Sequence, residues 1–485
     1  MRKAGILLAV SSLPSRHGIG DFGSDAREFL VLTKKMGFKI WQILPINPVG
    51  YGNSPYQPFG SKPFDELYIN LDYLVEEGLL KDNIPNYFAR RRVTHYDKVR
   101  TFKLKYLRRA FNKAKKGNLS AFNLWVSQNS WVYNYAVFIT FKKANDLVQW
   151  HYWPKDMREW IRNKNVDLTK YEDDIMFEMW LQYVAYDQWQ SLKAFANDLG
   201  IAIMGDIPIY VGIDSIDVWE NPSAFMLDED YFSTFVAGVP GDYFNADGQL
   251  WGNPLYDWEY LEQTKFAFWI DRLGYSMKLY DYIRIDHFRA FDSYWKIPAD
   301  SLTATNGEWA YPPGYALFDE IYRKLPTIKI VAEDLGDLRP QVLELRDHYN
   351  LPGMEISQFT FNPLEPYGNW PVNRLIYPGT HDNSTIRGWF GQKDKEFMRK
   401  ARKRLKELGF NDYRGFYDNF IAYNFGSDAK YCIIPMQDIL RYGEWSKMNS
   451  PSTIGSPNWE WKMVNFDGFK KESDFLKTLI KKYNR

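Results

Sequence analysis

Short apolar runs recur along the chain, and each ends in polar residues or in glycine and proline. Most runs are continuously apolar and do not alternate with polar residues, which is typical of parallel strands covered on both faces. Eight such runs predict eight strands, at residues 5–10, 40–44, 201–207, 282–286, 328–333, 354–359, 374–377 and 431–436.

Segments with helical spacing of apolar residues lie between several of these runs. Residues 25–36 place apolar side chains on one side, and Gly37 follows as a stop signal. Residues 393–408 predict a charged helix that ends at Gly409. Strands that alternate with helices predict an α/β fold, a (β/α)8 TIM barrel.

The strand spacing also predicts where the barrel is interrupted. About 155 residues separate the second and third runs, and structureless loops of that length are uncommon. Apolar residues recur there at helical intervals, so we expect an inserted, mainly helical subdomain at residues 81–180. The barrel itself would comprise residues 1–80 and 181–485, with a long loop at its C-terminal rim near 237–258.

Composition and charge exclude several classes of function and of site. The chain has 61 Lys and Arg against 60 Asp and Glu, a net charge of +1, which gives no reason to expect a nucleic-acid or membrane-surface protein. One cysteine, Cys432, excludes internal disulfides and multi-thiolate metal sites. The aromatic content of 18% supplies flat rings that can fill a core or stack on sugars and bases.

The first ten residues have the charged and apolar parts of a secretory signal, but the apolar part is short and no A-x-A cleavage site follows. They fit a buried strand better, and with the single cysteine they favour the cytoplasm.

A basic run could indicate a second function. Residues 90–116 contain twelve Lys and Arg against one acid, Asp97, with aromatic residues between them. A nucleic-acid patch would have this composition, and so would a solvated helix face whose charge is balanced by acids elsewhere. The near-neutral chain favours the second interpretation.

Polar residues follow several predicted strands at the ends that meet at one rim of a barrel, where function is expected. They are Asp206 at the third strand, Arg284, Asp286 and His287 at the fourth, Glu333 at the fifth, and His381 and Asp382 after the seventh. Carboxylates that converge without cysteines indicate a metal site or glycoside chemistry.

The retaining glycosidic mechanism needs two carboxyl groups about 5–5.5 Å apart. On a strand, Arg284 shares a face with Asp286 and can keep that aspartate ionised. Glu333 follows an apolar stretch, where burial would raise its pKa towards that of a general acid. Each acid alone is more often a helix cap or an ion-pair partner, and only their joint placement favours catalysis.

Several longer motifs carry a family resemblance. They are the residues at 11–15 and 18–21, 41–45, 53–57, 205–211 and 248–254, together with the strand-end motifs. This set resembles the amylomaltases, the 4-α-glucanotransferases of glycoside hydrolase family 77 in the α-amylase clan. The match spans the barrel from end to end, whereas the insert carries little that matches.

The resemblance implies a role for each matched position. Asp286 would be the nucleophile, Glu333 the acid/base, and Asp382 the carboxylate that holds sugar hydroxyls and distorts the ring. The implied substrate-binding residues are Arg284, which positions the nucleophile, His287, His381, Asp206, Ser54, Tyr56 as an aromatic platform, and Asp242, Tyr243, Phe244 and Trp251 in a mobile loop on the acceptor side.

Two positions depart from the family pattern. Gly241 stands where a second proline is expected, and Ser452 stands where the family usually has glycine. Both departures concern acceptor preference and leave the three carboxylates in place. The segment after Asp206 lacks the Asn-His that related α-amylases use near calcium, so we expect no metal and no cofactor.

The resemblance therefore predicts an enzyme that moves α-1,4-glucan segments between malto-oligosaccharides. A hydrolase on the same site and a non-catalytic glucan-binding protein are the alternatives. A binding protein gains little from an uncompensated cluster of acids, which disfavours the latter. We expect malto-oligosaccharides and longer glucans as partners, no nucleic acid or membrane, and a monomer or a weak homo-oligomer.

Overall fold

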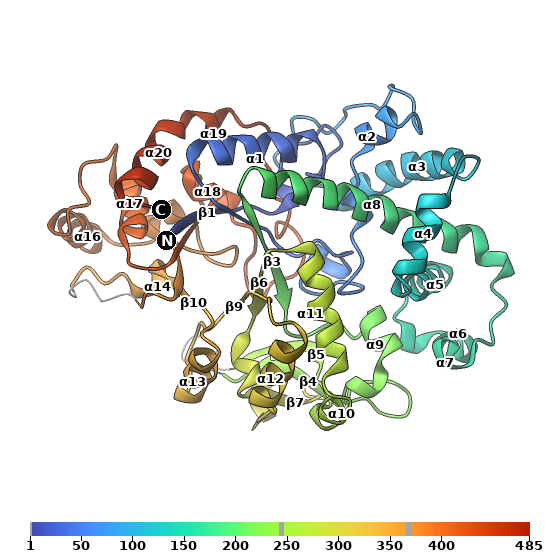
Figure 1. The fold of residues 1–485 in the computed structure, drawn as a ribbon. Helices are drawn as coiled ribbons and strands as arrows, with labels where there is room; N and C mark the ends of the chain where they lie inside the picture. The colour runs from blue at the N-terminus through green and yellow to red at the C-terminus, as the bar shows by residue number, and fades with distance from the viewer. Residues whose placement is uncertain (1, 242–246, 365–370) are drawn as a thin grey trace.

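The computed structural model describes residues 2–241, 247–364 and 371–485. Eight parallel strands form one sheet in the order β10-β11-β12-β1-β2-β3-β6-β9, at the centre of the molecule (Figure 1). The strands are β1 Lys3–Leu7, β2 Ile40–Gln42, β3 Ala202–Pro208, β6 Tyr282–Asp286, β9 Ile330–Ala332, β10 Gly353–Ile356, β11 Arg374–Tyr377 and β12 Tyr431–Pro435.

The sheet curves into a nearly closed barrel. The N–H of Ala332, the last residue of β9, donates to the carbonyl of Pro352 before β10 at 2.9 Å, so the two ends of the sheet adjoin. β1 lies between β12 and β2, with Lys3 opposite Tyr431. The predicted (β/α)8 barrel and its eight strands are confirmed.

Several strand boundaries differ from the predicted ones, and the largest differences are at the ends of β1 and β10. β1 ends at Leu7, and the predicted end of that run is a 3-10 helix, Val10–Ser12, which turns the chain across the rim. β10 ends at Ile356, and α14 (Ser357–Thr360) occupies the rest of the predicted strand. Apolar residues continue beyond β1, and the buried polar residues Ser357 and Gln358 follow β10, so burial alone did not mark either end.

Helices cover the outside of the barrel. The longer ones are α1 Ser24–Met36, α11 Ala267–Leu279, α12 Gly314–Lys324, α13 Pro340–His348, α16 Lys395–Glu407, α17 Phe416–Gly426 and α20 Ser473–Lys482, and the short ones are α9 Ile216–Glu220, α10 Trp258–Gln263, α15 Ile386–Gly391, α18 Met436–Ile439 and α19 Asp467–Lys471. Gly37 ends α1 with a left-handed φ of 98°, as the sequence predicts.

Helices also fill the long gap between β2 and β3, on the right of Figure 1. They are α2 Leu71–Glu76, α3 Tyr96–Ala114, α4 Ser120–Gln128, α5 Trp131–Ala144, α6 Lys155–Arg158, α7 Trp160–Asn163 and α8 Glu172–Asp198. α8 runs through residue 180, so one continuous helix belongs to both the proposed insert and the proposed barrel. The division of the chain into these two parts stays a proposal.

The basic run lies mainly on α3, and several of its cations contact carboxylates. Arg100 Nη2 lies 2.9 Å from Asp65, Arg108 Nη1 lies 3.1 Å from Asp173, and the buried Lys103 lies 3.6 Å from Asp21. These pairs are what the balanced-charge interpretation of the run predicts.

A second, antiparallel sheet of four strands lies at the rim, in the order β5-β4-β7-β8. Its strands are β4 Phe235–Val239, β5 Gln249–Pro254, β7 Tyr294–Pro298 and β8 Glu308–Ala310. The sequence predicted a loop near 237–258, and in the structure β4 and β5 lie in that region and pair with each other. A small separate core of Val236, Ile297 and Ala304 supports this sheet.

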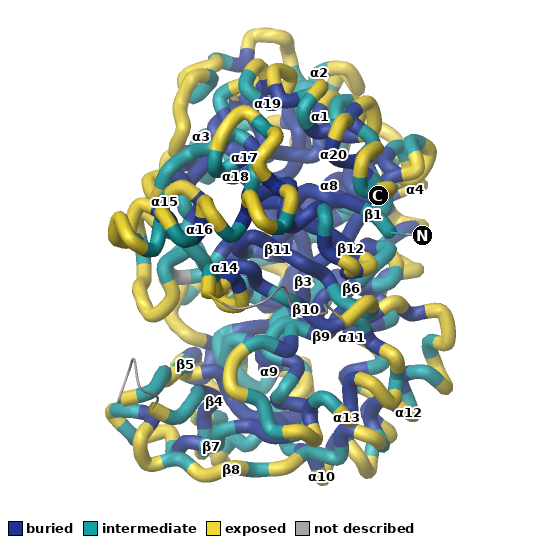
Figure 2. The backbone as a smooth tube through the Cα atoms, turned by 90° about the vertical axis from the view of Figure 1, so that its left-hand side faces the viewer, coloured by how far each residue is buried: buried dark blue, intermediate teal, exposed yellow. Residues whose placement is uncertain are grey.

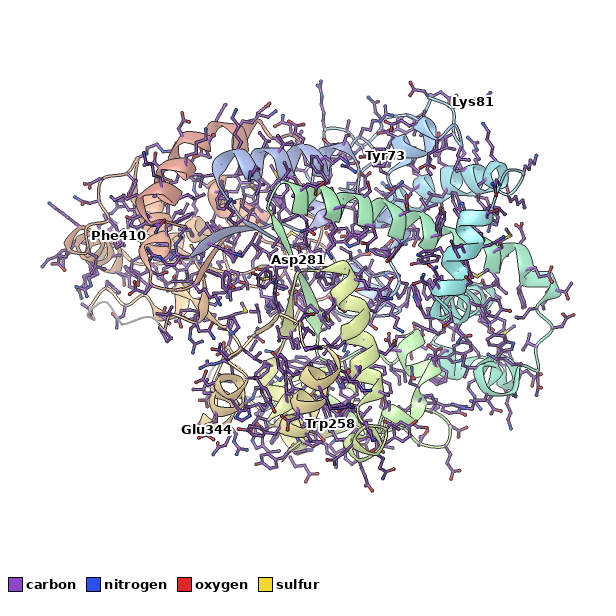
Figure 3. The ribbon with its side chains drawn as sticks, in the orientation of Figure 1. Tyr73, Lys81, Trp258, Asp281, Glu344 and Phe410 are labelled. Atoms are coloured by element: carbon purple, nitrogen blue, oxygen red, sulfur yellow. The ribbon has the colours of Figure 1, made fainter. Side chains whose placement is uncertain are left out.

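Burial follows the barrel, whose strands appear mainly in dark blue in Figure 2. At the end of the barrel opposite the site, Asp281 accepts hydrogen bonds from the N–H of Ile203 (2.7 Å) and from Asn197 Nδ2 (2.8 Å) (Figure 3). Cys432 is buried in β12. Within the described ranges, no helix is both long enough and apolar enough to cross a membrane.

Candidate active site

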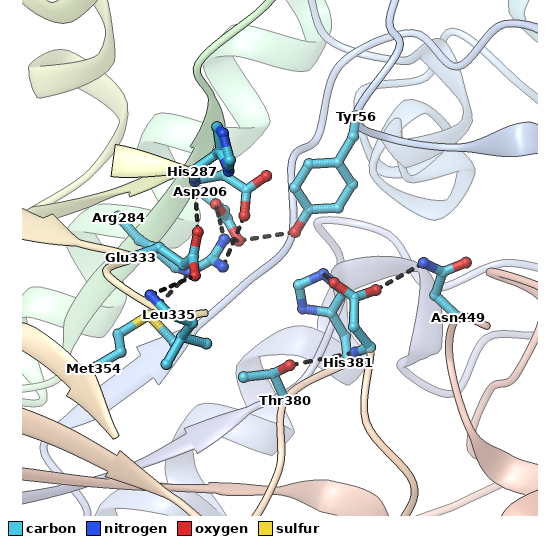
Figure 4. A network of polar contacts seen from close by, with 12 residues as sticks. Tyr56, Asp206, Arg284, His287, Glu333, Leu335, Met354, Thr380, His381 and Asn449 are labelled. Atoms are coloured by element: carbon cyan, nitrogen blue, oxygen red, sulfur yellow. Dashed lines mark hydrogen bonds and ion pairs between the residues drawn. The ribbon is translucent and has the colours of Figure 1, made fainter. Parts of the chain in front are cut away.

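The predicted strand-end residues gather at one rim of the barrel (Figure 4). Asp286 is the last residue of β6, Glu333 directly follows β9, and Asp206 lies near the end of β3. Because β3, β6 and β9 are consecutive neighbours in the sheet, their carboxyl ends bring these three acids together.

A buried guanidinium joins two of these acids. Arg284 Nη1 donates to both carboxylate oxygens of Asp206 at 2.7 Å, and Arg284 Nη2 lies 2.8 Å from Asp286 Oδ1. Burial raises the pKa of Asp286 above its ordinary value, and the nearby guanidinium opposes that rise. Arg284 thus contacts the Asp286 carboxylate directly and favours its ionised form against the effect of burial.

Backbone hydrogen bonds fix Glu333 beside Asp286. The N–H of Glu333 donates to the carbonyl of Ile285 (3.1 Å), and the N–H of Phe288 donates to the carbonyl of Glu333 (3.0 Å). His287 has a left-handed φ of 55°, and its N–H donates to Glu333 Oε2 at 2.6 Å. Such strained backbone is common where a site must be held in one geometry.

The pKa values of Glu333 and His287 both differ from those of the free side chains. The pKa of Glu333 rises to about 7, because burial and the neighbouring Asp286 disfavour its charged form. Burial lowers the pKa of His287 to about 3, so its imidazole is neutral and can both donate and accept hydrogen bonds. A carboxyl that is protonated near neutral pH can act as a general acid.

A second group of polar residues lies opposite Asp286 and Glu333 at the same rim of the barrel. Asp382 Oδ1 accepts a hydrogen bond from Asn449 Nδ2 (2.7 Å), and its Oδ2 lies 3.3 Å from His381 Nε2. The His381 ring stacks on Tyr56 with centroids 5.3 Å apart and an interplanar angle of 11°. Trp459 lies beside Tyr56 and His381, with ring centroids at 5.7 and 5.9 Å.

The Tyr56 hydroxyl connects the two groups. It donates to Asp206 Oδ2 at 2.9 Å, on the carboxylate that holds Arg284. Burial raises the pKa of Tyr56 well above its ordinary value, so the phenol remains a donor. Its backbone N–H donates to Ser54 Oγ at 3.3 Å, which places Ser54 on the same turn.

These residues line or adjoin an open cleft of about 530 Å³. Ser54, Tyr56, Trp251, Asp286 and Asp382 are all in its wall. Trp251 reaches it from β5, where its ring meets the His287 ring edge-on with centroids 4.8 Å apart. The antiparallel sheet therefore supplies one wall of the cleft, on the side where the sequence predicts an acceptor loop.

Not every predicted position can be placed. Asp242, Tyr243 and Phe244 lie outside the described residues. Ser452 lines the cleft with a left-handed φ of 64°, a conformation that favours glycine, which is the residue expected there from the resemblance.

Sequence reasoning missed several residues of the cleft, and two of them contact predicted site residues. Asn449 and Trp459 come from the segment after β12, where neither follows a predicted strand directly. Asn449 contacts Asp382, 67 positions earlier in the chain, and an asparagine in an irregular segment has no pattern that predicts such a contact.

In the described ranges, no group of three or more His, Cys, Asp or Glu side chains is arranged to hold a metal ion. The positive charge among the acids of the cleft comes from Arg284. That the protein needs no metal or cofactor stays a prediction.

Comparison with known proteins agrees with this geometry. A family model described as 4-alpha-glucanotransferase matches residues 8–466. Proteins named 4-alpha-glucanotransferase from Synechocystis sp. and Clostridium butyricum are each 40% identical to the chain, over 95% and 93% of its length and 94% of theirs.

Solved structures show the same likeness. The amylomaltase of Streptococcus agalactiae, solved in complex with acarbose, matches with a TM-score of 0.94 and 33% identity over the whole of both chains. That of Corynebacterium glutamicum, at 18% identity, shares the fold, with a TM-score of 0.81 over all of this chain and 75% of its own. The resemblance found in the sequence is confirmed, and the chain belongs to the 4-alpha-glucanotransferase family.

Proposed function

We propose that this protein transfers α-1,4-glucan segments between malto-oligosaccharides, with retention of the anomeric configuration and through a covalent glycosyl-aspartate. One observation carries the proposal. The ends of two adjacent strands hold Asp286 against a guanidinium, which favours its ionised form, and Glu333 against backbone N–H groups, where its pKa is about 7. Paired carboxyls with opposite protonation are what the retaining mechanism needs.

In the first step Asp286 attacks the anomeric carbon of the donor. Glu333 gives its proton to the glycosidic oxygen as that bond breaks, and the shortened glucan leaves with the proton. In the second step the Glu333 carboxylate takes the proton from the 4-hydroxyl of an acceptor glucan. That oxygen attacks the anomeric carbon, the bond to Asp286 breaks, and Glu333 is again protonated.

The other residues would bind and orient the donor sugar. Asp382, held by Asn449 and His381, presents a carboxylate to sugar hydroxyls, and the neutral His287 can bond another hydroxyl. Tyr56 offers an aromatic face beside them. Trp251 on β5 lies in the wall of the cleft, and we propose that an acceptor enters beside it and that this side of the cleft favours a sugar hydroxyl over water.

Product analysis with maltotriose tests this function. Transfer yields glucose together with maltopentaose and longer chains, whereas hydrolysis yields only maltose and glucose. Asp286→Asn should lower turnover by about 10⁴-fold or more, because a carboxamide cannot form the glycosyl ester. Asp337→Asn, an exposed acid on the loop after β9, is the matched control and should keep full activity. Appreciable transfer by Asp286→Asn would exclude the assigned nucleophile.

A further inference from the structure

A methionine in the interior of the barrel contacts the arginine of the candidate active site. Met354 is the second residue of β10 and is only 1% exposed. Its Sδ accepts a hydrogen bond from Arg284 Nε, with the two atoms 3.4 Å apart (Figure 4). β9 lies between β6 and β10, so the two side chains meet on the inside of the barrel, where alternate strands fill the same layer.

This contact completes the surroundings of the Arg284 guanidinium. Nη1 donates to both carboxylate oxygens of Asp206, Nη2 contacts Asp286, and Nε donates to Met354. Each nitrogen therefore has a partner, and the partners lie on three different strands, β3, β6 and β10. Because the guanidinium is planar and rigid, it cannot turn without breaking at least one of these contacts.

The chemistry of the acceptor matters as much as its position. A thioether sulfur is a neutral and weak acceptor. Asp206 and Asp286 already share the single positive charge of Arg284. A third carboxylate at Nε would compete with Asp286 for that charge and would disfavour the ionised form of Asp286 further. The sulfur of Met354 satisfies Nε and leaves the charge of the guanidinium to the two acids.

The backbone of Met354 is itself fixed on both sides. Its N–H donates to Asp334 Oδ1 at 2.7 Å, and its carbonyl accepts from Arg374 Nη1 at 2.9 Å. Asp334 is buried, and its other carboxylate oxygen lies 3.0 Å from Arg374 Nη1. Asp334 directly follows Glu333, so the segment that carries the proposed acid/base also fixes the position of Met354.

We propose that Met354 is a positioning residue for the transfer reaction, which acts by holding the Arg284 guanidinium against the Asp286 carboxylate. The inference rests on the proposed function, since the role exists only if Asp286 is the nucleophile. Asp334, Met354 and Arg284 then form a continuous series of contacts from the acid/base to the nucleophile. This series keeps the two reacting carboxyls in one geometry through buried groups.

Loss of the sulfur should change the ionisation of Asp286. Burial raises the pKa of Asp286, and Arg284 opposes that rise. The other charged or titratable groups that face Asp286 are Asp206, Glu333, Asp382 and His381. A guanidinium without a partner at Nε should bond Asp286 less well, so the pKa of this aspartate should rise further. Since Asp286 attacks as the carboxylate, activity at low pH should then be lost at a higher pH than in the parent protein.

α-Maltosyl fluoride isolates this ionisation, because fluoride leaves without a proton from Glu333. The acid limb of kcat/KM for this donor should therefore report the Asp286 carboxylate. Met354→Leu nearly conserves the volume of the side chain but removes the acceptor. We expect its acid limb to move up by about 0.5–1 pH unit, with a much smaller change in kcat/KM above the limb. Met36→Leu makes the same change at a buried methionine of α1 and should leave the limb in place.

Two further variants complete the test. Met354→Gln supplies a neutral oxygen acceptor, and its acid limb should return towards that of the parent protein. Met354→Ile, whose branched side chain suits a strand, replaces Met354→Leu if that variant is insoluble.

A limb that stays in place without the sulfur, a fall in kcat/KM by the same factor at every pH, or an equal shift in Met354→Gln would overturn the proposal. If the parent protein itself neither consumed the fluoride nor transferred segments of maltotriose, the proposed function would fail instead.

Discussion

Glu333 is the residue through which pH should act most directly on the proposed reaction. Its pKa of about 7 lies above that of a free glutamate, so the carboxyl is protonated below pH 7 and loses its proton as the pH rises through 7. The first step needs the protonated form. We therefore expect kcat/KM for maltotriose to fall about tenfold per pH unit above about 7.

A donor whose leaving group needs no proton can distinguish a general-acid role of Glu333 from a structural role. α-Maltosyl fluoride releases fluoride without needing a proton from Glu333, so its consumption in the first step should not fall above pH 7. Glu333→Gln should likewise lose far more activity on maltotriose than on the fluoride. With the fluoride this variant should accumulate a maltosyl adduct on Asp286, visible by mass spectrometry. Equal losses on both donors would remove Glu333 as the general acid.

Tyr56 is a second residue of interest, because the contribution of its hydroxyl to kcat/KM can be measured separately from that of its ring. Tyr56→Phe keeps the ring that stacks on His381 but removes the hydrogen bond to Asp206. A hydrogen bond to a charged group contributes about 1.5–3 kcal/mol, so kcat/KM should fall about ten- to a hundredfold. Tyr73→Phe removes a hydroxyl that accepts from Arg27 away from the cleft, and activity should not change. An unchanged kcat/KM in Tyr56→Phe would show that Arg284 alone fixes Asp206.

At the scale of single residues, the sequence predicted those site residues that lie at the end of a strand. Asp206, Asp286 and Glu333 could be placed because the ends of parallel strands converge in any barrel. Asn449 and Trp459 could not, because they reach the cleft from an irregular segment whose path depends on the finished tertiary structure.

At the scale of elements, two glutamines of α8 attach this helix to the segment at residues 64–70, which precedes the proposed insert. Gln182 Nε2 donates to the carbonyl of Phe64 (2.9 Å), and its Oε1 accepts from the N–H of the same residue (2.8 Å). Gln188 makes the same pair of bonds with Asn70, at 3.2 and 2.7 Å. Each side chain thus pairs with a backbone segment as a neighbouring strand would.

Removing one of these pairs of hydrogen bonds should weaken the attachment of α8 to residues 64–70. Gln188→Ala leaves a buried N–H and a buried carbonyl of Asn70 without their partner, which should lower the free energy of unfolding by about 2 kcal/mol. Urea denaturation should show a lower midpoint with an unchanged slope. Gln190→Ala removes one exposed bond two positions further along α8 and should leave the midpoint unchanged. Equal midpoints for the two variants would mean that water replaces the Gln188 bonds.

The barrel strands could be predicted from the sequence for one physical reason. Barrel strands are buried on both faces, so their apolar runs are continuous and stand out. β5 alternates between partly buried and exposed positions over its first four residues and contains a glycine and a proline, which made it look like a loop. The antiparallel sheet was missed for this reason, although its Trp251 was singled out.

At the scale of the whole molecule, the two ends of the chain lie side by side, as the N and C marks in Figure 1 show. Arg2 Nη2 donates to the carbonyl of Tyr483 at 2.6 Å, and Arg2 Nη1 donates to that of Ser427 at 2.9 Å. Chains with adjacent ends commonly tolerate circular permutation when the new ends fall in an exposed turn.

A permutant can test this. Residues 2 and 485 would be joined by a short glycine-serine linker, and new ends would open between Gly117 and Asn118, in an exposed turn after α3. We expect this permutant to fold and to keep transfer from maltotriose within about twofold of the parent, since no described site residue lies near the cut. Opening the chain instead between Ile43 and Leu44, which are buried after β2, should prevent folding. An insoluble Gly117–Asn118 permutant would show that this turn guides folding.

The position of β1 between β2 and β12 also sets an order of events during synthesis. β1 leaves the ribosome first, yet one of its two partners is made some 430 residues later. At about 5–20 residues per second that interval is roughly 20–90 s. Throughout it β1 has one open edge, which other chains can pair with. The nascent barrel is thus most exposed to misassociation beside its own first strand, and only translation of β12 ends that exposure.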